Sequence, residues 1–243
     1  MTITNQKFVC GHASHIGWTR SQNEDNYAAF SEQGLWVLSD GMGGRKGGKI
    51  ASDIVVKTVS QAVFDGATLT EAINAAHHNI LSSAHMGVGS KGMGATCTAL
   101  QINEDKYFTV AWVGDSRAYY WNGQSLNQIT EDHTLAQLMV NRGVLSQEQA
   151  EKHPYSHILS QVAGDPVKDI RVDTATGQLD ERSQILLCSD GLTNEAKESD
   201  IARIMAEYNS EQEKVDRLVD LSLRNGGKDN ITVIIVSVTD HEA

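Results

Sequence analysis

Three aspartates in this chain each stand where an apolar, strand-like run meets a turn that contains glycine. Asp40 and Asp190 each follow such a run in the phrase Ser-Asp-Gly, and Asp229 precedes the apolar run 231–236. An aspartate at a strand end is carried by a rigid element, and a neighbouring glycine lets the backbone turn so that its carbonyl reaches the same ligand. Carboxylate and carbonyl oxygens, without the spacing of histidine or cysteine ligands, are the donors that a hard divalent cation prefers. The three strand ends therefore predict an oxygen-rich metal site.

The elements that must position these carboxylates come in blocks of strands separated by pairs of helices. Strands are expected at 8–13, 27–30, 35–39, 95–102, 107–113, 117–121, 169–174, 184–188 and 231–238. Helices are expected at 48–64, 69–85, 200–208 and 210–224, and in the first two of these apolar residues recur at helical spacing. This order predicts the α+β class, with a central antiparallel β-sandwich flanked on both faces by pairs of helices in α-β-β-α layers, rather than a doubly wound parallel sheet.

Composition limits the class of function. The 243 residues suit one large domain or two small ones, and the formal net charge is −11, from 20 basic and 31 acidic residues. Such a chain is a poor nucleic-acid binder, because that binding depends on lysine and arginine. No apolar run approaches the ~20 residues of a membrane span, and residues 1–7 lack the character of a signal peptide. Cys10, Cys97 and Cys188 lie far apart in apolar runs, so we interpret them as core residues of a protein in a reducing cytoplasm rather than a disulfide or zinc site.

One segment imitates a nucleotide-binding motif. Residues 43–49 fit the G-x-x-x-x-G-K pattern of a P-loop and lie between a strand and a helix. A P-loop continues with serine or threonine to bind magnesium, whereas this chain has Ile50. The blocks of strands also disagree with the βαβ unit that carries a P-loop, so we set nucleotide binding aside.

Seven motifs in fixed order resemble the metal-dependent protein serine/threonine phosphatases of type 2C, most closely their short bacterial members. The motifs are Arg20-Ser21-Gln22-Asn23-Glu24-Asp25-Asn26, Asp40-Gly41-Met42-Gly43-Gly44, Met93-Gly94-Ala95-Thr96, Val113-Gly114-Asp115-Ser116-Arg117-Ala118-Tyr119, Glu131-Asp132-His133-Thr134, 187–192 and Lys228-Asp229-Asn230-Ile231-Thr232. The match covers essentially the whole chain. It implies the same sandwich fold and a single catalytic domain over 1–243, with a flap subdomain at about 134–165 that biases substrate choice.

The resemblance implies a hydrolase that removes phosphate from phosphoserine and phosphothreonine on proteins, using water activated by two Mg²⁺ or Mn²⁺ ions and forming no phospho-enzyme. In this interpretation Asp40 bridges the two ions and the carbonyl of Gly41 binds one of them. Asp190 and Asp229 hold the first ion, and Glu24 holds the second through water. Two ions about 3.5–4 Å apart activate water and neutralise the phosphoryl oxygens, which is what the reaction requires.

Asp115 carries two interpretations. The resemblance implies that it holds a third, weaker metal ion together with Asp190. The alternative is that Asp115 caps the turn before the strand at 117–121, a common role of aspartate.

Arg20 is expected to bind the substrate phosphate and to be catalytic together with Asp40, because a guanidinium donates two parallel hydrogen bonds to phosphate oxygens. Taken alone, a surface pair with Glu24 four residues on is the better interpretation, and the place of Arg20 in the family motif reverses that preference. Asp25 and Asn230 are expected to orient metal ligands or water without touching the ion.

The chain departs from the family at two positions. Some members carry a histidine directly after Asp-Gly as general acid, and many bacterial members carry one after Gly-Met-Gly-Gly, whereas these positions are Met42 and Arg45 here. Neither side chain donates a proton near neutral pH. We therefore expect either that water held by the metal protonates the leaving group, or that activated esters react faster than serine esters. Arg45 alternatively binds a second acidic group of the substrate.

Two other functions are left open by the residues. One is a catalytically weak member that serves as a binding or regulatory module, and the other is a phosphatase of small phosphoesters or of phosphorylated anti-anti-sigma-type regulators. The main prediction is a monomeric signalling enzyme of the cytoplasm, whose partners are phosphorylated proteins, the targets of a cognate serine/threonine kinase. Neither nucleic acid nor membrane is expected as a partner.

Overall fold

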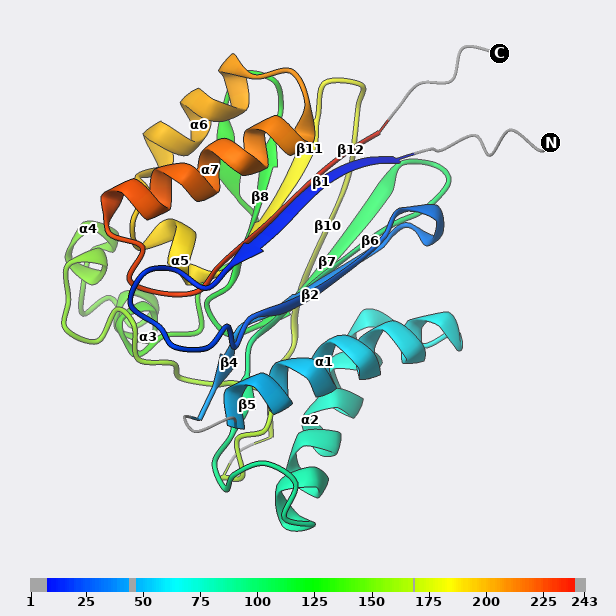
Figure 1. Cartoon of the computed structure of the whole chain (residues 1–243), viewed down its shortest axis with the longest axis vertical. Coiled ribbons are helices and arrows are strands. Elements are labelled where there is room, and N and C mark those ends of the chain that lie inside the picture. The colour runs from blue at the N-terminus through cyan, green and yellow to red at the C-terminus, as the bar shows by residue number, and fades with distance from the viewer. Residues whose placement is uncertain (1–7, 44–46, 168, 239–243) are drawn as a thin grey trace.

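Two antiparallel sheets pack face to face in the computed structural model, which describes residues 8–43, 47–167 and 169–238 (Figure 1). The first sheet has the order β1-β12-β11-β8-β9 and the second has the order β10-β7-β6-β3-β2. Helices α6 and α7 cover the outer face of the first sheet, and α1 and α2 cover that of the second (Figure 1). The predicted α-β-β-α layers are therefore confirmed.

The described residues form these elements in chain order. The strands of the first sheet are β1 (Phe8–His15), β8 (Arg117–Trp121), β9 (Leu126–Gln128), β11 (Gln184–Cys188) and β12 (Ile231–Val238). Those of the second are β2 (Asn26–Phe30), β3 (Leu35–Ser39), β6 (Cys97–Ile102), β7 (Tyr107–Val113) and β10 (Asp173–Gln178), while β4 (Gly41–Met42) pairs separately with β5 (Gly94–Ala95). The helices are α1 (Gly47–Phe64), α2 (Leu69–His85), α3 (Leu135–Asn141), α4 (Gln147–Glu151), α5 (Asp190–Thr193), α6 (Glu198–Glu207) and α7 (Glu211–Asn225), with a 3₁₀ turn at Ser31–Gln33.

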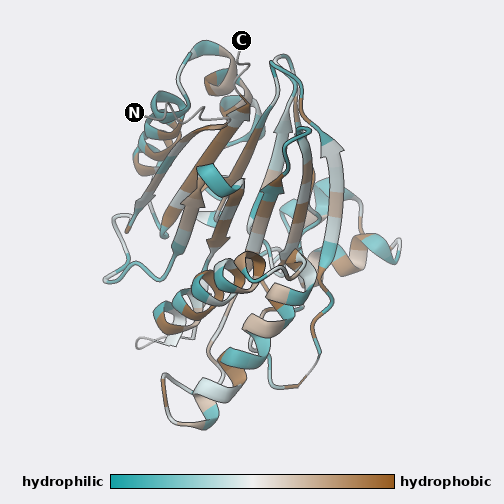
Figure 2. Ribbon diagram, turned by 90° about the vertical axis from the view of Figure 1, so that its right-hand side faces the viewer, coloured by the Kyte–Doolittle hydropathy of each residue, from teal (hydrophilic) through white to brown (hydrophobic). Residues whose placement is uncertain are grey.

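The central strands are apolar on both faces because both faces are covered. In β3, Trp36 and Leu38 enter the core between the sheets, while Leu35 and Val37 pack under α1 and α2. In β11, Leu187 enters the same central core and Leu186 packs under α6 and α7. Figure 2 shows the resulting hydrophobic segments along the central strands. A strand buried on both faces reads as a continuous apolar run, which is why the sequence marks β3, β11 and β12 so clearly.

Some boundaries differ from the sequence prediction. The strand expected at 169–174 is wrong. Ile170 and Val172 lie in a loop and pack in the core under α1 and α2. The strand of this region is β10, at the sheet edge, and its side chains alternate between half-buried and exposed. Short elements without an apolar signal, namely β4, β9 and α5, were not expected. The cysteines are free thiols, of which Cys97 and Cys188 are buried and Cys10 is half-buried. Within the described ranges, none of the helices combines the length and the apolar character that crossing a bilayer demands.

Candidate metal centre

The strand ends that carry the predicted carboxylates meet at one end of the sandwich, beside α5, α3 and α4 (Figure 1). β11 and β12 are antiparallel neighbours, so Cys188 at the end of β11 pairs with Val233 near the start of β12. Asp190 follows the first strand, Asp229 precedes the second, and Asp40 follows β3 of the other sheet. All three aspartates line one cavity of about 710 Å³.

The same cavity collects nearly all of the predicted site residues. Its lining includes Arg20, Glu24, Asp40, Gly41, Asp115, Asp190, Asp229 and Asn230. Asp25 is buried, with hydrogen bonds to Ser189 and Thr232. Met42 also lines the cavity, whereas Arg45 lies outside the described residues. Motifs separated by up to 209 positions in the chain thus share one site.

Asp40 is fixed by its backbone to the motif that ends at Thr96. Its N–H donates to Thr96 Oγ1 at 2.9 Å, and the Thr96 N–H donates to its carbonyl at 2.8 Å. Thr96 Oγ1 also lies 2.8 Å from the hydroxyl of Ser116, the residue after Asp115. These buried bonds hold Asp40 and Asp115 in one rigid frame at the cavity.

Gly41 and Gly48 lie so close together that neither has room for a side chain. A Cβ at Gly48 would stand 2.6 Å from the carbonyl oxygen of Gly41 and 2.7 Å from Glu24 Oε2. Gly48, at the start of α1, therefore allows this helix to pack closely against β4. This packing explains one glycine of the P-loop-like segment without a nucleotide.

Two hydroxyl groups beside the cavity hold the buried side chain of Asp25. Asp25 Oδ2 accepts hydrogen bonds from Ser189 Oγ at 2.8 Å and from Thr232 Oγ1 at 2.6 Å. Burial, with the fields of Asp190 and Asp229, raises the pKa of Asp25 to about 7 although both hydroxyls lower it. Since Ser189 and Thr232 belong to adjoining strand ends, Asp25 ties them together next to Asp190 and Asp229.

Asn230 fastens the loop that carries Arg20 and Glu24. Its Oδ1 accepts from the N–H of Glu24 at 2.8 Å, and its Nδ2 donates to the carbonyls of Ile16 at 2.9 Å and Gln22 at 3.1 Å. The side chain next to Asp229 thereby sets the path of the 16–24 loop.

Asp115 is buried at the boundary of two cavities. It lines the cavity of about 710 Å³ and a neighbouring one of about 520 Å³, which it shares with Asp190. Burial, followed by the field of Asp190, raises the pKa of Asp115 to about 8. Its backbone is set by Gly114, whose N–H donates to His133 Nδ1 at 3.1 Å. This position beside Asp190 is compatible with the third-ion interpretation.

Arg20 is paired with Asp229 rather than with Glu24. Its Nε donates to Asp229 Oδ1 at 2.8 Å and its Nη2 donates to Oδ2 at 2.6 Å. The hydrogen bonds that Arg20 donates to Asp229, together with the negative charge of Asp229, raise the pKa of Arg20, so the guanidinium stays charged. The predicted phosphate ligand and a predicted metal ligand are therefore in direct contact.

The donor set of the cavity fits a hard divalent cation. Burial and the fields of Asp25, Asp190 and Asp115 raise the pKa of Asp40 well above its usual range, and burial followed by Asp229 raises that of Asp190. Asp190 Oδ1 is also buried without a hydrogen-bond partner. A buried carboxylate oxygen without a partner is unfavourable, and a bound cation removes that penalty and keeps the group ionised.

The carboxylates of the cavity do not converge on a single point. Across the part of the chain that the structure describes, no three His, Cys, Asp or Glu side chains are arranged to hold an ion. Both oxygens of Asp229 accept hydrogen bonds from Arg20, so Asp229 must share or release that pair to coordinate a metal.

Sequence reasoning missed several residues of this site. Thr96, Ser189 and Thr232 stand inside the recognised motifs, but only the structure shows that their hydroxyls bind Asp40 and Asp25. His157 and Ile158, from the segment after α4, also line the cavity. Their spacing carries no signal, because a loop brings them to the cavity.

Comparison with known proteins matches this arrangement to one family. The family model described as Protein phosphatase 2C matches residues 13–224. The serine/threonine phosphatase stp of Listeria welshimeri is 34% identical over 233 residues, covering 90% of this chain and 92% of the relative. The crystal structure of the Mycobacterium tuberculosis serine/threonine phosphatase PstP/Ppp superimposes with a TM-score of 0.87 at 29% identity, covering 96% of this chain and 100% of that one. The catalytic domain of PstP in complex with two manganese ions has a TM-score of 0.85 at 28% identity, with 96% and 99% coverage.

Proposed function

The chain belongs to the protein phosphatase 2C family and is a metal-dependent hydrolase of phosphoserine and phosphothreonine on proteins, and we propose that the cavity at the strand ends is its catalytic centre. The observation that carries this assignment is the convergence of the family motifs on one cavity. The alternative of an inactive binding module is not favoured, because Glu24, Asp40, Asp190 and Asp229 are all present there. The cognate kinase, the monomeric state and the cytoplasmic location stay predictions.

In this proposal Asp40 would hold both of two Mg²⁺ or Mn²⁺ ions, and the carbonyl of Gly41 would help to hold one of them. Asp190 and Asp229 would hold the first ion, and Glu24 would hold the second. Divalent ions in such a site lower the pKa of water and neutralise charge on the phosphoryl group, the two requirements of phosphate-ester hydrolysis. Asp115 and Asp190 are proposed to hold a further, weaker ion.

Arg20 is proposed to bind the substrate phosphate while keeping its contact with Asp229. A guanidinium has five N–H donors, and Asp229 engages one on Nε and one on Nη2. The three others are free to bind phosphate oxygens. Arg20 thereby positions the phosphoryl group over the carboxylates and excludes water from one side of it.

The segment 134–165 is proposed to act as a flap. What supports this role is its placement: His157, Ile158 and Leu159 line the cavity, while α3 and α4 form a small separate unit. An isolated antiparallel β-bridge between Thr134 and Leu159 joins the two ends of this unit. A loop in this position contacts the peptide around the phosphate.

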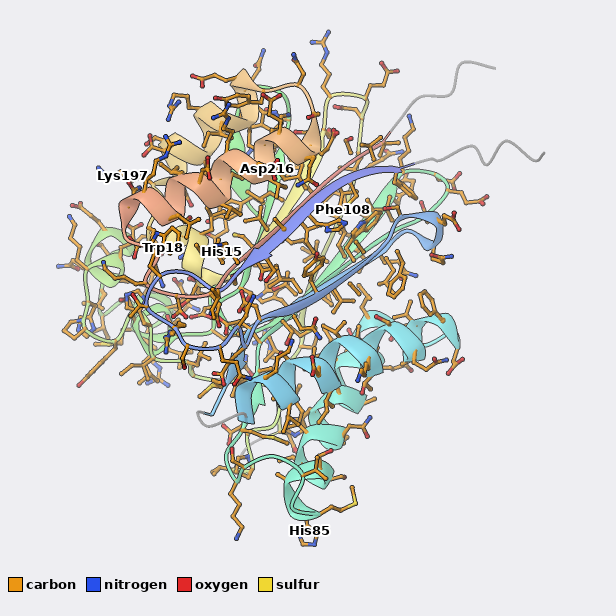
Figure 3. The ribbon with its side chains drawn as sticks, viewed as in Figure 1. His15, Trp18, His85, Phe108, Lys197 and Asp216 are labelled. Atoms are coloured by element: carbon orange, nitrogen blue, oxygen red, sulfur yellow. The ribbon has the colours of Figure 1, made fainter. Side chains whose placement is uncertain are left out.

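The test is phosphate release from a phosphothreonine peptide with Mn²⁺, with EDTA, and in an Asp40→Asn variant. We expect turnover that requires Mn²⁺ and falls by at least about 10³-fold in the variant, as for loss of a group that acts on the reacting centre. Asp216→Asn, on the exposed side of α7, is the matched control and should behave as the unmodified chain (Figure 3). Full activity of Asp40→Asn would refute the assignment.

A further inference from the structure

The catalytic cavity has an apolar part as well as a charged one. Besides the carboxylates and Arg20, its lining includes Met42, Ile158 and Leu159, which together we call the apolar wall. Met42 lies in β4, two residues after Asp40, whereas Ile158 and Leu159 come from the segment after α4. Two distant parts of the chain thus bring apolar side chains to the same cavity.

The apolar wall offers surface that nothing in the described chain covers. Met42 is 42% exposed and Ile158 is 44% exposed. Single exposed apolar residues are common on proteins and need no explanation. These two differ because both face the cavity that contains the catalytic carboxylates.

The backbone under the apolar wall is fixed. Met42 pairs with Gly94 in the small sheet of β4 and β5. The Ile158 carbonyl accepts from the N–H of Leu135 at 2.8 Å, and Leu159 pairs with Thr134. The backbone that carries the apolar side chains is therefore held in place before a substrate arrives, which favours selective binding.

The size of the cavity indicates which part of a substrate could contact the apolar wall. Its volume of about 710 Å³ lies in the range of pockets that hold whole drug-sized ligands, so it has room for more than one phosphorylated side chain. A phosphoprotein necessarily brings the neighbours of the phosphorylated residue to the cavity. The flexible thioether of Met42 adapts to side chains of different shape.

We propose that the apolar wall binds an apolar side chain adjacent to the phosphorylated residue, and that Met42 and Ile158 determine this preference. The inference rests on the proposed function, since it concerns the substrate of the same cavity. It names the substrate class as phosphopeptides with leucine, isoleucine, methionine or a similar residue next to the phosphothreonine.

The experiment compares phosphothreonine peptides that differ only by leucine or serine, placed immediately before or immediately after the phosphothreonine. For the unmodified chain we expect kcat/KM to favour leucine at one of these positions by about tenfold, as for one apolar contact in a binding pocket. Met42→Ser and Ile158→Ser should each reduce this ratio to about threefold or less, mainly through KM. Met86→Ser is the matched control, because Met86 is 71% exposed at the end of α2, outside the cavity lining, and should keep the full ratio.

Because the ratio is measured within each variant, a general loss of activity does not imitate the result. Hydrolysis with equal kcat/KM for leucine and serine peptides at both positions would overturn the inference and leave the proposed function intact. An unchanged ratio in both Met42→Ser and Ile158→Ser would overturn it as well. Absence of Mn²⁺-dependent hydrolysis of every peptide would overturn the proposed function and the inference together.

Discussion

Arg20 and Asp229, which are 209 positions apart in the chain, form a two-point ion pair at the proposed catalytic cavity. The Nη2–Oδ2 distance is 2.6 Å, and the Arg20 side chain is 56% exposed while that of Asp229 is 30% exposed. Asp229 Oδ1 also accepts from the N–H of Asn230 at 2.8 Å. The pair links a proposed phosphate ligand directly to a proposed metal ligand, so substitution of Arg20 should affect both functions.

Arg20→Lys should weaken substrate binding strongly although it keeps the charge. Lysine is a point charge and does not donate in parallel to Asp229 and phosphate, so one charge-assisted hydrogen bond is lost. At ~1.5–3 kcal/mol for such a bond, kcat/KM on a phosphothreonine peptide should fall by about 10- to 100-fold. Arg203→Lys, on the exposed face of α6, is the control, and equal losses in both variants would contradict the role of Arg20.

Arg20→Gln should bind the metal more tightly while it loses activity. The substitution removes a positive charge beside Asp229, and a unit charge at a partly exposed site is worth ~1 kcal/mol, or about fivefold in Kd. Isothermal titration with Mn²⁺ measures the affinity without relying on turnover. Weaker Mn²⁺ binding would show that Arg20 supports the metal site rather than competing for its carboxylate.

Trp18 should report metal binding through its fluorescence. It is 68% exposed, whereas Trp36, Trp112 and Trp121 are at most 5% exposed. Its backbone N–H donates to the carbonyl of Gly227 at 2.7 Å, two residues before Asp229, and its indole Nε1–H donates to the carbonyl of Leu223 at 3.0 Å. Figure 3 shows Trp18 beside His15. Movement of Asp229 onto an ion should therefore alter the surroundings of the indole.

Addition of Mg²⁺ should change the emission of the unmodified chain, and the change should disappear in Trp18→Phe. Asp40→Asn, which keeps Trp18 but lacks a proposed ligand, should show little response at the same Mg²⁺ concentration. A full response in Trp18→Phe would mean that a buried tryptophan senses the ion instead.

The sequence predicted most of what depends on apolar runs and on local motifs. Strand ends at Asp40 and Asp190 follow from buried runs before Ser-Asp-Gly, and the core strands were placed within one or two residues. The partner of Arg20 was not predictable, because Glu24 is near in sequence while Asp229 is near only in the folded chain. Strand β10, which follows the flap, was misplaced in the prediction. The apolar residues Ile170 and Val172, which carry the pattern expected of a strand, lie in the loop before it rather than in the strand itself.

His133 should make stability depend on pH. Its neutral Nδ1 accepts from the N–H of Gly114 at 3.1 Å, and its Nε2 lies 3.1 Å from Asp173. Burial lowers the pKa of His133 below its ordinary value of 6.5, and this effect outweighs the opposite one of Asp173. The unfolded chain therefore takes up a proton first as pH falls, so the stabilisation is complete well above pH 6.5 and declines from there toward the lower pKa of the folded state.

The variant that tests this dependence is His133→Asn, whose amide oxygen still accepts from Gly114 but does not titrate. Unfolding by urea with saturating Mg²⁺, between pH 7.5 and 5, should show a shallower decline than for the unmodified chain. The difference is at most ~1.4 kcal/mol per pH unit, the limit for one proton. His85→Asn, at the exposed end of α2, should leave the profile unchanged, and parallel profiles for all three proteins would exclude His133 as the source.

Gly48→Ala should damage both stability and metal binding, because the added methyl group would meet the Gly41 carbonyl and the Glu24 carboxylate at 2.6 and 2.7 Å. We expect a loss of ~1–3 kcal/mol in the free energy of unfolding, as for overpacking of a core, and weaker Mg²⁺ binding as both oxygens are displaced. Gly66→Ala is the control: its φ of 95° strains alanine, but no atom lies within 4 Å of the new Cβ. It should therefore lose stability, by ~1–2 kcal/mol, and keep its Mg²⁺ affinity. Titration of Mg²⁺ against Trp18 emission measures this affinity, and equal affinities in the two variants would show that the contact between Gly41 and Gly48 serves packing alone.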